Sequence, residues 1–123
     1  MIRAMQIAAL IAAAVLIQNA PAKTVDIVSV TGCLREASAG DWLLVNATDP
    51  VRSSANAPAK NELPATPPVG RNQFKLIGVS EFNLPPHKDH VVIVKGLHIQ
   101  AQPVGRLNVT SVTSISASCP AAR

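Results

Sequence analysis

The sequence predicts an all-β protein: a small closed β-barrel of five strands, preceded by a cleaved signal peptide. Runs rich in Val, Ile and Thr recur along the chain and are separated by segments rich in Gly, Pro, Asn or Ser. Only Trp42, Phe74 and Phe82 are aromatic, so the core must be built from Val, Ile and Leu. Of the two cysteines, Cys33 lies near the end of the first such run and Cys119 near the end of the chain.

The first 22 residues have the features of a secretory signal peptide. Arg3 and the N-terminal amine precede an uncharged apolar run over residues 7–17, and Ala-Pro-Ala at 20–22 places small residues where signal peptidase reads them. We expect cleavage between Ala22 and Lys23. The apolar run is shorter than the roughly 20 residues of a membrane-spanning helix. We therefore expect no transmembrane anchor after processing, and a periplasmic or secreted location.

The mature chain, residues 23–123, has the length of a single domain. The whole sequence carries a formal charge of +4, but the charged residues are scattered rather than clustered. The charge is therefore only a weak indication of anionic partners.

Two cysteines in an exported chain indicate a disulfide between Cys33 and Cys119. A metal site or a catalytic thiol is the alternative. Such a bond would tie the first strand to the C-terminal residues. Closing so long a loop contributes on the order of 4 kcal/mol in the chain-entropy model.

Residues 24–34 (TVDIVSVTGCL) are predicted to form the first and central strand, because most of them are β-branched. Val28, Val30 and Leu34 share one face, whereas Ile27 belongs to the other, so we expect a bulge near residues 27–28. Gly32 allows a sharp bend. A bent strand can pair with different neighbours along its two halves, which helps a small barrel to close.

A turn over residues 36–40 leads to a second strand at 41–47, with Trp42 and Leu44 on one face. Residues 48–72 follow, which we call the proline-rich segment; it contains five of the ten prolines and has no apolar period. Long segments of this kind are functional or disordered. We expect a mobile loop, either as a solvated insertion or as a flap over one face of the barrel.

The remaining elements follow the same alternation of strands and turns. Phe74 and Leu76 are expected to point inward from the third strand, and Ser80 to cap a short helical turn that Pro85-Pro86 ends. The predicted elements are strand 73–78, helical turn 79–84, strand 90–100, turn 102–105 and strand 106–118.

Five strands with a helical turn between the third and the fourth have the connectivity of the OB-fold, a Greek-key barrel. An incomplete sandwich or another five-stranded barrel is the alternative. The chain also resembles small exported bacterial OB-fold proteins of unassigned function. That resemblance implies binding of small ligands or cations, or a role in envelope stress, but it carries no functional residue over. It rests on the signal peptide and on residues 30–34 (VTGCL), 42–47 (WLLVNA), 74–78 (FKLIG), 87–92 (HKDHVV), 94–96 (VKG) and 116–119 (SASC).

Residues 87–90 (HKDH) are the only cluster with metal-ligand residue types. On a helical turn, His87 and His90 could bind a transition metal with Asp89 as a third ligand. Pro85-Pro86 before the cluster and the strand after it favour a structural turn instead. Asp89 would then bond backbone amides and both histidines would face solvent. His98 is expected on the strand surface rather than as a ligand.

Nucleic acid is not an expected partner, because three core aromatic residues cannot form a platform for stacking bases. No phosphate-binding loop, serine elbow or close acidic pair is present, so we expect no enzyme and no cofactor.

Two functions remain. A non-enzymatic binding module would receive a small ligand, cation or peptide between the first strand, the proline-rich segment and residues 87–90, in a concave pocket beneath the segment. An envelope structural or protein–protein interaction protein would instead present a flat apolar patch or an open sheet edge. Transition-metal binding through His87 and His90 is a further alternative. We expect a monomer.

Overall fold

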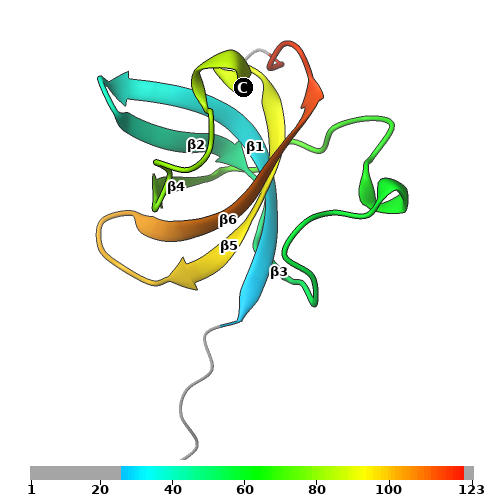
Figure 1. Ribbon diagram of the computed structural model, residues 1–123, viewed down its shortest axis with the longest axis horizontal. Coiled ribbons are helices and arrows are strands. Elements are labelled where there is room, and N and C mark those ends of the chain that lie inside the picture. The colour runs from blue at the N-terminus through cyan, green and yellow to red at the C-terminus, as the bar shows by residue number, and fades with distance from the viewer. Residues whose placement is uncertain (1–25, 121–123) are drawn as a thin grey trace, which may run out of the picture.

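The computed structural model describes residues 26–120, so the predicted signal peptide and its cleavage between Ala22 and Lys23 lie outside the described part of the chain. The described residues are all-β, as predicted, and contain no α-helix (Figure 1). The elements are β1 (Ile27–Ser38), β2 (Asp41–Ala47), β3 (Val51–Arg52), the 3-10 turn η1 (Lys60–Glu62), β4 (Asn72–Ile77), the 3-10 turn η2 (Pro85–His87), β5 (Val91–Ile99) and β6 (Gly105–Ser116).

Five of the strands form a closed ring. Around it, β1 pairs with β2, β2 with β4, β4 with β6, β6 with β5, and β5 again with β1. The β4–β6 pair is parallel and the other four pairs are antiparallel. The short β3 pairs with β1 at Val28 and Ser29, outside the ring. β1 therefore has β3 beside its first half and β2 beside its second half, as expected for a long central strand.

The predicted bulge near residues 27–28 was wrong. β1 pairs with β5 in unbroken register from Ile27 to Cys33. Among the pairs that β1 makes, the register shifts only opposite β2, between Glu36 and Ser38. β1 also continues to Ser38, through most of the predicted turn. Gly32 permits close contact between β1 and β2, since a Cβ there would lie 3.0 Å from the Val45 carbonyl oxygen.

The core fills the interior of the ring. Its members come from all five ring strands and from Leu84 before η2, and they include two of the three aromatic side chains expected in the core, Trp42 and Phe74. Phe82 packs against this cluster while partly exposed. Along β1 the interior residues are Val28, Val30 and Leu34, which follow the two-residue period of a strand.

The 3-10 helix between β4 and β5 does not lie where a helical turn was predicted, although the predicted range contains one hydrogen-bonded turn, in which the Phe82 amide donates to the Val79 carbonyl oxygen (2.9 Å). The sequence indicated residues 79–84, capped by Ser80 and ended by the two prolines. The 3-10 turn instead contains the prolines (Pro85–His87), and Leu84 before it makes no side-chain cap. Proline suits a first turn because its φ is already helical and its missing N–H has no partner to lose there.

The predicted disulfide between Cys33 and Cys119 is present, with Cα atoms 5.7 Å apart. It joins β1 to the residues that follow β6. Within residues 26–120 no helix is long and apolar enough to span a membrane.

Candidate functional site

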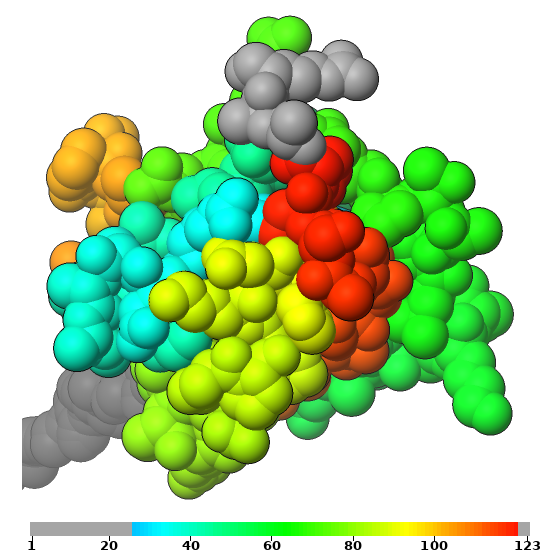
Figure 2. Space-filling view, turned by 90° about the horizontal axis from the view of Figure 1, so that it is seen from above, coloured from blue at the N-terminus to red at the C-terminus, as the bar shows by residue number. Residues whose placement is uncertain are grey.

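The proline-rich segment runs along the outside of the ring and is tied to it at both ends. At its start, the Thr48 amide donates to the Thr31 carbonyl oxygen (2.9 Å), and the Thr31 amide donates to Thr48 Oγ1 (3.0 Å). At its end, the Gly70 amide donates to the Asn46 carbonyl oxygen (3.0 Å). The segment predicted as a loop contains two short elements, β3 and η1. Figure 2 shows the segment, in green, against the red C-terminal part of β6.

The segment covers the outer face of β5. Val92 and Val94 point into the core, so Val91, Ile93 and Lys95 point outward by the strand period. All three outward residues are nevertheless buried, with 3 % or less of their surface exposed. The buried outer face explains why a segment without an apolar period stays against the ring.

Lys95 is the most unusual residue on this face, because its side chain is completely buried. Its ammonium group donates to Ser53 Oγ (2.8 Å), to Glu62 Oε2 (2.9 Å) and to the Ala57 carbonyl oxygen (3.5 Å). All three acceptors belong to the proline-rich segment. An ammonium group has three N–H donors, so these contacts satisfy it fully.

Glu62 is the acidic partner of this buried charge. It ends η1, and its side chain is 43 % exposed. The hydrogen bond from Lys95 and a second from the Ala59 amide hold the pKa of the Glu62 carboxyl below its usual value. The ion pair therefore joins a lysine sealed inside the protein to a carboxylate in contact with water.

The strands beside Lys95 contribute hydroxyl groups rather than charges. Ser29 lies opposite Lys95 on β1, and Ser111 lies opposite it on β6. Ser111 Oγ is buried without a hydrogen-bond partner. Next to it on β6, Thr110 Oγ1 donates to the Asn56 carbonyl oxygen (3.1 Å), which adds a further tie to the segment.

A hollow of about 410 Å³ opens between β1, β3 and η1, directly beside this cluster. Its polar lining includes Ser29, Thr31, Arg52, Ser53 and Glu62, and Val51 adds an apolar wall. Asp49 also lines the hollow, so hydroxyl groups, two carboxylates and one guanidinium are available to bind a small polar molecule.

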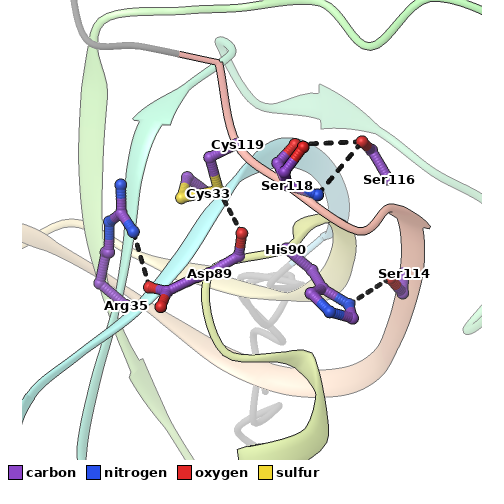
Figure 3. The surroundings of a disulfide bond; sticks show 8 residues. All are labelled: Cys33, Arg35, Asp89, His90, Ser114, Ser116, Ser118 and Cys119. Atoms are coloured by element: carbon purple, nitrogen blue, oxygen red, sulfur yellow. Dashed lines mark hydrogen bonds and ion pairs between the residues drawn. A yellow bond between two sulfur atoms is a disulfide. The ribbon is translucent and has the colours of Figure 1, made fainter.

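Two of the three residues predicted as a possible metal site, Asp89 and His90, contact different partners (Figure 3). Asp89 Oδ1 accepts a hydrogen bond from Arg35 Nη1 at 2.6 Å rather than from backbone amides, and the two groups form an ion pair. His90 Nδ1 lies 2.8 Å from Ser114 Oγ. The His87 and His90 rings meet edge to face with centroids 6.1 Å apart, and His87 Nδ1 is buried without a partner. Both histidines are half-buried rather than turned to solvent.

Within residues 26–120, no group of three or more His, Cys, Asp or Glu side chains could hold a metal ion. His98 is not brought to the cluster: it packs edge to face on Phe74, with ring centroids 5.5 Å apart, beside a separate cavity of about 490 Å³ at the β5–β6 turn. The disulfide lies close to Asp89, whose carbonyl oxygen is 3.0 Å from Cys119 Sγ.

Sequence reasoning missed Lys95, Glu62 and Ser53 as a site. One signal was present: Lys95 directly follows the apolar run VVIV (residues 91–94) inside a predicted strand. Nothing in the sequence identified its partner. No family model, no curated protein and no solved structure matches the chain in the comparisons.

Proposed function

We propose that the protein is an exported, non-enzymatic binding module that holds a small polar ligand between β1 and the proline-rich segment. The single observation that carries this proposal is the hollow beside Ser53 and Glu62, beneath a segment that the Lys95–Glu62 ion pair fastens to the ring. A concave site under the segment is the feature that separates a ligand module from a docking protein, which needs a flat apolar patch or an open edge.

We further propose that the ring is an OB-fold barrel. In chain order the ring strands pair as 1-2-3-5-4-1, with the third and fifth strands parallel, and a 3-10 turn connects the third strand to the fourth. This order is the Greek-key connectivity of the OB-fold, a barrel that binds ligands through its surface and loops. The Cys33–Cys119 bond supports export, because disulfides persist in oxidising compartments.

The binding proposal is tested by recovering the protein from its own cell envelope and weighing it intact by native mass spectrometry. The wild type is expected to carry a bound small molecule. Val51→Trp should lose this molecule, because Val51 is 64 % exposed and lines the hollow. Ile99→Trp is the matched control: Ile99 is also an exposed apolar strand residue, but it does not line the hollow, so the variant should keep the ligand.

Two results would overturn the proposal. One is that the wild type carries no small molecule but co-purifies with an envelope protein, and that the Val51→Trp variant co-purifies with the same protein. The other is a bound molecule that both tryptophan variants retain, since the hollow would then not be the site.

A further inference from the structure

Lys95 carries a buried charge whose only acidic partner among the described residues comes from outside the ring. The groups opposite it on β1 and β6 are the hydroxyls of Ser29 and Ser111. Of the other charged residues of the hollow, Arg52 forms an ion pair with Asp26 (2.7 Å), whereas Asp49 accepts a hydrogen bond from the neutral amide of Asn72 (2.8 Å). The ring thus presents one cation in a hydroxyl-lined setting and leaves its anion to be supplied by another part of the chain.

Stability alone does not account for a lysine at this position. Desolvating an ammonium group costs several kcal/mol, and well-packed apolar residues commonly replace a buried ion pair without loss. Ile93 and Val91 show that apolar side chains can be buried on this same outer face of β5. A lysine at a position that an apolar residue could occupy is better explained by the binding of an anion than by a contribution to stability.

The Glu62 side chain is placed so that it can move away from Lys95. Its carboxylate lines the hollow and is 43 % exposed, whereas Lys95 is sealed behind it. It is held from a three-residue 3-10 turn whose residues are all exposed, not from a packed helix. Turning the Glu62 side chain into solvent therefore breaks few contacts, and it opens the Lys95 ammonium group to whatever occupies the hollow.

We propose that Lys95 is the anion-binding centre of the hollow and that Glu62 occupies it in place of a ligand carboxylate. The ligand class is then a small organic carboxylate. Its carboxylate replaces that of Glu62 on Lys95 Nζ, beside the hydroxyl of Ser53, and Ser111 Oγ offers an unused hydroxyl in register with Lys95. This inference rests on the proposed binding function and specifies its ligand.

The experiment uses propionate, which reproduces the side chain of glutamate beyond its Cα, and propionamide as a neutral probe of the same shape. Affinities are measured by calorimetry at constant ionic strength, on chains shown to be folded by circular dichroism. Glu62→Gln should bind propionate about tenfold or more tighter than the wild type, because one competing charge-assisted contact is removed. It should not bind propionamide.

Two variants make this result specific. Lys95→Met combined with Glu62→Gln should abolish propionate binding. Glu81→Gln removes an exposed glutamate from the β4–β5 connection, away from the hollow, and should bind as the wild type does. If Glu62→Gln does not fold, the wild type provides the test: propionate should shift the amide resonance of Ala59, which donates to Glu62 Oε1 at 3.1 Å.

Three outcomes overturn the anion site: equal propionate affinity in Glu62→Gln and the wild type, equal response to propionamide, or binding that survives the loss of Lys95. An Ala59 amide resonance that propionate does not shift also overturns the anion site. A neutral native ligand that Val51→Trp loses and Lys95→Met keeps overturns this inference while leaving the binding module intact. Conversely, if this protein is recovered from the cell envelope without any bound ligand, the proposed function fails even if Glu62→Gln binds propionate.

Discussion

Lys95 Nζ and Glu62 Oε2 are 2.9 Å apart, although the two residues are separated by 33 positions and differ completely in exposure. The lysine belongs to a central strand of the ring, and the glutamate belongs to a 3-10 turn outside it. This one contact neutralises the only fully buried charge among the described residues and holds the proline-rich segment over the outer face of β5.

We expect the removal of Lys95 and the removal of Glu62 to lower the free energy of unfolding by different amounts. Lys95→Met should leave the free energy of unfolding within about 1 kcal/mol of the wild type, because the remaining glutamate can be hydrated and methionine fits a buried site. Glu62→Ala should be clearly less stable than Lys95→Met, because it leaves an ammonium group buried without a counter-ion. Urea unfolding of both variants measures the difference, and equal losses would contradict it.

The contribution of this pair should depend on pH in one direction. The folded-state pKa of Glu62 is lowered, so its stabilising effect is fully present above the unfolded pKa and is lost as the pH falls through the folded pKa. The gap in melting temperature between the wild type and Glu62→Gln should therefore be constant above about pH 5 and close in more acidic solution. Melting curves recorded from about pH 7 to about pH 3 test this, and a gap that widens on acidification would refute it.

Removing the disulfide should have the largest effect on stability. The bond closes a loop of 86 residues in a domain with a small core. Cys33→Ala combined with Cys119→Ala should lower the free energy of unfolding by about 4 kcal/mol, through the larger entropy of the unfolded chain. Denaturant unfolding of the double variant measures the loss. Reduction of the bond with dithiothreitol should destabilise the wild type by a similar amount and leave the stability of the double variant unchanged.

Gly96 and Gly105 should respond differently to alanine, although both lie in the β5–β6 hairpin. A Cβ at Gly96 would overlap the Asn108 carbonyl oxygen and lie 3.1 Å from Val109 Cα, at a shift in the strand register. Gly96→Ala should therefore cost about 2 kcal/mol or more. A Cβ at Gly105 meets only side chains, at 3.4 Å or more, so Gly105→Ala should be nearly neutral. Thermal unfolding of the pair provides the comparison.

The sequence predicted the strands well where the two-residue period was clear. Val28, Val30 and Leu34 alternate into the core of β1, as Phe74 and Leu76 do in β4. It predicted less well where two local preferences compete. Ser80 suggested a capped turn before the prolines, but the prolines themselves start the 3-10 turn. The register shifts between Glu36 and Ser38 and between Lys95 and Gly96 were also missed, because they depend on how each strand pairs with its neighbour.

The amino-acid sequence by itself determined the all-β class, the inward faces of the strands and the pairing of the only two cysteines, because periodicity, β-branching and a count of thiols are local or compositional properties. Only the tertiary structure decided which side of the ring the proline-rich segment covers. It also buried Lys95 there with Glu62 beside it. A segment without an apolar period carries no local indication of its packing partner, so its position follows from the outward face that the assembled strands leave uncovered.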